Sequence, residues 1–153
     1  MGLDMYLFAE QSIPDWEEEG QQLKRAITEA VGSSVPDFLK DRLRGLKFEA
    51  MYWRKSNHIH AWFVKNVQAG TDDCGYYPVS RDDLEQLVLA CEQVLDDHTL
   101  ADQLLPRQGG FFFGSTDYTE YYYEDLKSTR DQLKQLLSEP NLRFVDFTYH
   151  SSW

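Results

Sequence analysis

Residues 52–66, with the sequence YWRKSNHIHAWFVKN, combine aromatic side chains with groups that can bind ligands or carry protons. At helical spacing, Trp53, Asn57 and His60 share one face, while Arg54, His58 and Lys65 fall on a face that we expect to be solvated. An amide, an imidazole and an indole on one face could line a pocket for a small polar ligand. The simpler interpretation is packing, because aromatic residues at helical spacing usually belong to the core.

A second stretch, RQGGFFFGSTDYTEYYY at 107–123, is rich in tyrosine and glycine. Its neighbouring tyrosines cannot all point the same way on a helix, so some should be exposed, which favours a protein interface. If the two stretches lie side by side, their polar and aromatic groups converge. The candidate ligand- or partner-binding residues are therefore Trp53, Arg54, Asn57, His60, Asp73, Cys74, Ser115, Tyr118 and Tyr122.

Three other chemistries find weaker support in the sequence. His58 and His60 would point about 160° apart on a helix, and no ligand spacing matches a zinc or calcium site, so we expect neither a metal nor a cofactor. Cys74 lies beside two aspartates, which oppose the ionisation that a nucleophilic thiol needs. The segment GGFFFGST lacks the lysine of a phosphate-binding P-loop. No catalytic residue is assigned.

The composition indicates one folded domain over residues 1–153. The chain is 42% hydrophobic and 14% aromatic, which is too apolar for a disordered protein. It has 26 acidic and 15 basic residues and a net charge of −11, which disfavours direct binding to nucleic acid or to anionic membranes. With no apolar run of membrane-spanning length and no signal peptide, we expect a cytoplasmic protein whose oligomeric state stays open.

The patterns predict a small α+β domain with a mostly antiparallel sheet of about four strands and helices packed on one face. Strands are expected at 3–8, 46–51, 111–113 and 142–149. Longer helices are expected at 16–31, 80–95 and from the GSTD turn at 114–117 to 137, with shorter helical segments at 37–44 and 99–105. Ser80 and Asp83 have capping-box spacing at the start of one helix.

Several motifs resemble a family of small proteins from phages and bacterial genomes with no agreed biochemical activity. The motifs are MGLDMYL, YWRKSNHIHAWFVKNVQ, DDCGYYPVS, LLPRQGGFFFGSTDYTEYYYEDL and the closing SSW. Residues 13–47 depart from that family, in which a shorter, strand-like connection is usual. The resemblance implies a phage or prophage accessory protein that acts in the host cytoplasm, and it supplies no catalytic residue.

We therefore expect a binding protein that engages a host protein, for example to counter a defence system, and the sequence favours this role over that of an enzyme. One alternative is a small-ligand-binding protein or enzyme that uses the pocket around Asn57 and His60. A second is an acidic mimic of DNA, although acidity more often serves solubility.

Overall fold

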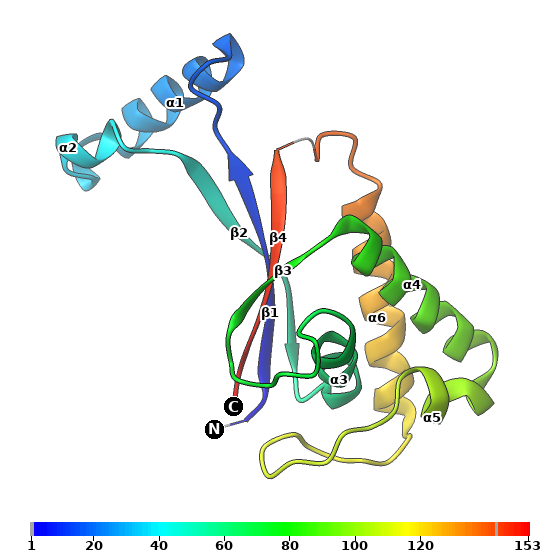
Figure 1. The fold of residues 1–153 in the computed structure, drawn as a ribbon. Coiled ribbons are helices and arrows are strands. Elements are labelled where there is room, and N and C mark those ends of the chain that lie inside the picture. Colours follow the sequence, from blue (N-terminus) through cyan, green and yellow to red (C-terminus); the bar gives the residue numbers. More distant parts are fainter. Residues whose placement is uncertain (1, 143) are drawn as a thin grey trace.

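Four antiparallel strands in the order β2–β1–β4–β3 form the sheet at the centre of the computed structural model (Figure 1). The strands are β1 (Asp4–Ser12), β2 (Gly45–Arg54), β3 (Tyr76–Val79) and β4 (Val145–Ser152). The structure describes residues 2–142 and 144–153. Met1, in the first family-like motif, and Arg143, in the last predicted strand, lie outside the described residues.

Alternating side chains give the sheet two different faces. Met5 and Leu7 of β1 are fully buried, whereas Tyr6 between them and Phe8 after them stay partly accessible on the opposite face. Residues that are paired across antiparallel strands point to the same side, so the register carries this division across all four strands. A register shift between Leu7 and Phe8 marks a bulge opposite β2.

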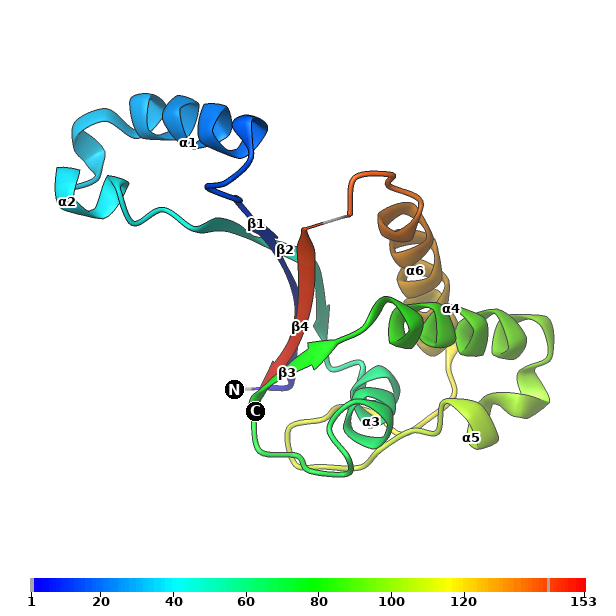
Figure 2. The same cartoon turned by 45° about the horizontal axis from the view of Figure 1, so that its top comes forward.

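Helices cover only one face of the sheet. In Figures 1 and 2, α3 (Asn57–Asn66), α4 (Arg81–Asp96) and α6 (Glu120–Leu137) lie together on one side of the strands. Leu84, Leu87, Leu126 and Leu133 of α4 and α6 are fully buried in the core. The short segments η2 (His98–Leu100) and α5 (Ala101–Leu104) lead from α4 to the loop that precedes α6.

A helical arm extends from the strands β1 and β2. It consists of residues 13–44 and contains α1 (Glu18–Val31), η1 (Gly32–Ser34) and α2 (Asp37–Lys40). Both views show the arm leaving the sheet on the side away from α3, α4 and α6. No arm residue belongs to the hydrophobic core cluster of the described residues.

The predicted α+β class is confirmed, and so is the capping box. The Ser80 hydroxyl accepts a hydrogen bond from the Asp83 backbone N–H at 3.0 Å, and the Asp83 carboxylate accepts one from the Ser80 N–H at 2.9 Å. The strand predicted at 111–113 is wrong: these residues form a turn, and Phe111 is 96% exposed. The fourth strand is instead β3, at residues where the sequence analysis predicts no strand.

None of the helices among the described residues is both long enough and apolar enough to span a membrane.

Candidate functional site

Asn57 holds the loop at 105–119 against the start of α3. Its side chain is fully buried, and its Nδ2 donates hydrogen bonds to the carbonyl oxygens of Phe113 and Ser115 at 2.9 and 3.0 Å. Its Oδ1 accepts a hydrogen bond from the Gln108 backbone N–H at 3.1 Å. The Asn57 amide forms these hydrogen bonds with the protein backbone, so its role in the free chain is to hold the loop at 105–119 in place.

His60 is the centre of a buried hydrogen-bonded chain. Its Nδ1 lies 2.7 Å from the Tyr149 hydroxyl and its Nε2 lies 2.9 Å from the Asp72 carboxylate. The other Asp72 oxygen accepts a hydrogen bond from the Trp153 indole N–H at 3.1 Å. His60 and Tyr149 are fully buried, and burial raises the pKa of Tyr149 well above its ordinary value. The chain ties α3 to β4 and to the C-terminus.

The other candidates are distributed over several local structures. Trp53 is buried and donates a hydrogen bond from its indole N–H to the Thr129 hydroxyl at 2.9 Å, which links β2 to α6. Tyr122 is buried and donates from its hydroxyl to the Leu105 carbonyl, whereas Tyr118 is partly exposed and donates to Asp102, both at 2.8 Å. Arg54, Asp73 and Ser115 are exposed, and Cys74 is half-buried in the loop before β3.

His58 corrects the expected solvated face of α3. The side chain is fully buried between Tyr122, whose ring centroid is 4.5 Å away, and Arg107, whose guanidinium lies 3.3 Å from Nδ1. Burial, together with the positive charge of Arg107, lowers the pKa of His58 to about 3. His58 is therefore neutral near pH 7. The helix α3 is buried on most of its circumference because the loop at 105–119 covers the side that faces away from the sheet.

A groove of about 400 Å³ lies elsewhere, on the outer side of α3, α4 and α5. Its lining includes the apolar residues Trp62, Ala90 and Leu104 together with glutamine and asparagine side chains. None of the nine candidate residues lines this groove. Within residues 2–142 and 144–153, no three His, Cys, Asp or Glu side chains come together as a possible metal site.

The arm presents the apolar side chains that the core does not use. Trp16 is 79% exposed and Phe38 is 64% exposed, and Leu23 and Leu39 are also exposed. The amphipathic pattern at 16–31 is therefore correct as a helix but does not identify a core face. In a monomer, large apolar side chains gathered on a projecting element are typical of an interaction surface.

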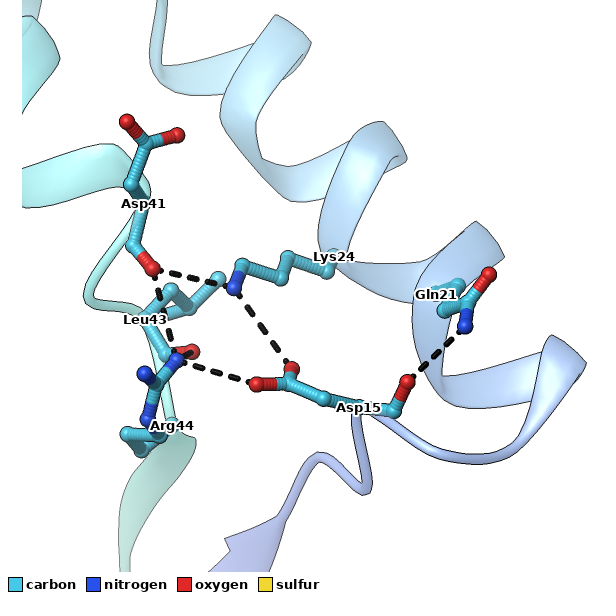
Figure 3. Close-up of polar contacts among 6 residues, drawn as sticks. All are labelled: Asp15, Gln21, Lys24, Asp41, Leu43 and Arg44. Atoms are coloured by element: carbon cyan, nitrogen blue, oxygen red, sulfur yellow. Dashed lines mark hydrogen bonds and ion pairs between the residues drawn. The ribbon is translucent and has the colours of Figure 1, made fainter.

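Polar contacts hold the arm closed at its base (Figure 3). The Asp15 carboxylate lies 3.5 Å from the Lys24 ammonium of α1 and 3.1 Å from the Arg44 guanidinium before β2. Lys24 also donates to the Asp41 carbonyl at 3.0 Å, and Gln21 donates to the Asp15 carbonyl at 2.8 Å. These contacts connect the two ends of the arm, so α1 is oriented before any partner binds.

Gly20 permits the tight return of the chain at the start of α1. A Cβ atom at this position would lie 2.1 Å from the carbonyl oxygen of Pro14, which is shorter than any allowed contact. Glycine is unfavourable inside a helix, where it costs about 1 kcal/mol relative to alanine. The close approach to Pro14 accounts for its presence, and it fixes the direction in which α1 leaves β1.

The arm also differs from the rest of the molecule in charge. Residues 13–44 contain five basic and seven acidic residues, so the arm has a net charge of −2, whereas the rest of the chain has −9. An apolar surface with a nearly balanced charge is easier to desolvate than a strongly acidic one. The arm thus combines exposed apolar side chains with a nearly balanced charge.

The sequence pattern alone did not identify the exposed apolar surface of the arm. The sequence places Trp16, Leu23, Phe38 and Leu39 on helical segments, but helical spacing alone cannot tell which element, if any, covers a face. Residues 13–47 are also the part of the chain that lies outside the motifs on which the expected resemblance is based.

No protein-family model, curated protein or solved structure matches the chain.

Proposed function

We propose that this chain is an accessory protein of the phage or prophage type that binds a host protein in the host cytoplasm through the helical arm. The observation that carries the proposal is the exposure of Trp16 and Phe38 on an element that has no residue in the hydrophobic core cluster of the described chain. Tryptophan and other large side chains of this kind supply much of the binding free energy at protein interfaces.

The closed base of the arm supports the same proposal. Because Asp15 joins α1 to the segment before β2, the exposed side chains are presented on a preformed element. A preformed binding element loses less conformational entropy on association than a flexible loop. The arm thus has both the apolar contact area and the preorganisation that a protein-binding element requires.

A comparative capture experiment tests this proposal. Tagged wild-type protein, the double variant Trp16→Ser/Phe38→Ser and the control Phe111→Ser are incubated with extract of a bacterial host, and the bound proteins are quantified by mass spectrometry. Phe111 is 96% exposed but lies on the loop before α6, so its variant removes an exposed aromatic side chain outside the arm.

The expected result is a protein that wild type and Phe111→Ser retain equally and that the double variant does not retain. Purified, this protein should bind the wild-type chain with a measurable Kd. If every retained protein is bound equally by the arm variant, binding through the arm is refuted.

A further inference from the structure

The face of the sheet opposite the helices carries a row of aromatic side chains across all four strands. In the register, Tyr52 of β2 pairs with Tyr6 of β1, Tyr6 pairs with His150 of β4, and His150 pairs with Tyr76 of β3. Tyr52 and Tyr76, at the two ends of the row, are exposed. We call this row and its neighbours on the same side of the sheet the open face, because the helices of the described chain cover the other side (Figure 2).

The rings of the open face contact one another. The centroids of Tyr76 and His150 are 4.1 Å apart with their planes inclined by only 3°, so the two rings lie face to face. Tyr6 lies within 6.0 Å of His150, 5.3 Å of Tyr52 and 5.7 Å of Phe8. The facing surfaces of Tyr76 and His150 are thus already occupied, and a flat nucleobase could not insert there without separating the pair.

Carboxylates outnumber cationic groups on this face. The strand register places four acidic residues and two basic ones on the same side as Tyr6 and Phe8. They are Asp4, Glu10, Glu49, Asp146, Lys47 and Arg54. An excess of negative charge repels phosphate, and at −11 overall a second copy of the chain is also repelled.

Lys47 already shows how a cation can bind to this surface. Its ammonium lies 4.1 Å from the centroid of the Phe8 ring and 5.4 Å from that of Tyr76, and 3.6 Å from the Glu10 carboxylate. An aromatic face and a carboxylate together stabilise a positive charge through cation–π attraction and ion pairing. A lysine or arginine side chain of a partner could interact with aromatic rings and carboxylates of this face in the same way.

We propose that the open face is a second docking surface, distinct from the arm, and that it binds a lysine- or arginine-rich segment of a partner protein. Charge complementarity with the four carboxylates selects a basic segment, and the tyrosine side chains supply apolar contact area with hydroxyl groups at its edge. This inference does not depend on binding through the arm, because none of its residues belongs to residues 13–44.

A titration of the full chain with a defined peptide tests the proposal. The probe is an eight-residue peptide of alternating arginine and serine, and a peptide with glutamate in place of arginine is the control. Backbone amide shifts are followed by NMR on the ¹⁵N-labelled protein. Shifts are expected to gather on all four strands around Tyr6 and Tyr76, and the glutamate peptide should produce none.

Two variants with matched controls separate this site from general attraction to an acidic protein. Tyr76→Ser leaves the charge unchanged and should weaken binding at least about threefold, whereas Tyr121→Ser, at another exposed tyrosine on α6, should not. Lys47→Gln removes the resident cation and should tighten binding by about two- to fivefold. Lys127→Gln, on the exposed side of α6, makes the same change in charge and should have a much smaller effect.

Several outcomes would overturn the proposal. Chemical shift changes spread over α4 and α6, or equal effects of Lys47→Gln and Lys127→Gln on the affinity, would show that the peptide binds only by general attraction to an acidic protein. A wild-type dimer in sedimentation that Tyr76→Ser converts to a monomer would assign the open face to a second copy of the chain. A variant that lacks the arm should bind the peptide as wild type does, so failure of the arm proposal leaves this test unaffected.

Discussion

Removal of the arm should leave the rest of the protein folded. The structure suggests the change itself: Ser12 pairs with Gly45, and the Ile13 backbone N–H donates to the Arg44 carbonyl at 2.9 Å. The two chain ends therefore already lie at the spacing of a hairpin. Replacing residues 14–43 by Asn-Gly would join β1 and β2 through a two-residue turn of the type that antiparallel strands prefer.

The expected change in the free energy of unfolding is small. The arm contributes no side chain to the core cluster, and the ion pairs of Asp15 are partly exposed, so each contributes only about 0–1 kcal/mol. The shorter connection lowers the entropic cost of closing the hairpin by about 2 kcal/mol for a flexible chain. The two effects oppose each other, and we expect the armless protein to be within about 2 kcal/mol of wild type.

Urea unfolding followed by circular dichroism measures this difference. The control is Leu126→Ala, which removes a fully buried core side chain and should cost about 2–5 kcal/mol. If the armless protein does not fold, or loses as much stability as Leu126→Ala, the arm is part of the folding core. The separation of arm from core would then be wrong.

Three further predictions follow from individual contacts. Gly20→Ala should loosen the arm, because the added Cβ would lie 2.1 Å from the Pro14 carbonyl oxygen. Amide hydrogen exchange in α1 should become faster while the unfolding midpoint stays unchanged, and unchanged exchange would refute the close approach. Asn57→Ala should cost about 1–3 kcal/mol in urea unfolding, since it removes the donor to the buried Phe113 carbonyl and the acceptor of the half-buried Gln108 N–H; a neutral effect would contradict the role of Asn57 in holding the loop at 105–119. Because the folded-state pKa of His58 is about 3 and its ordinary value is 6.5, the unfolded chain binds more protons between these values. Stability should therefore fall as pH drops below 6.5, by up to about 1.4 kcal/mol per unit. His58→Gln should flatten this slope while His98→Gln, at an exposed position, preserves it; equal slopes in both variants would exclude His58 as the cause.

Local sequence patterns predicted helices and strands better than they predicted which other segments pack against them. Ser80 and Asp83 satisfy each other within one helical turn, so their spacing is sufficient to predict the cap. Phe111 belongs to an apolar triplet that suggests a buried strand, but the glycines around it form a turn that leaves the ring in solvent. The strand β3 is short and is defined by its pairing with β4, which no local pattern contains.

The candidate site shows the same limit. The sequence pattern singles out Asn57 and His60 as polar groups among aromatic residues, but residue type does not reveal whether a hydrogen-bonding partner is a ligand or the protein. Here Asn57 is satisfied by backbone atoms of the loop at 105–119 and His60 by Tyr149 and Asp72. These partners lie far away in the sequence, so only the tertiary structure could supply them.

We propose above all that the arm is the surface through which this protein binds another protein. Hydrogen exchange of the chain, alone and with the protein captured by the wild-type arm, tests it most directly. We predict that bound partner slows exchange in α1 and α2, with the strongest protection at 16–40. Protection confined to α3, α4 and α6, with the arm exchanging as in the free chain, would contradict the claim.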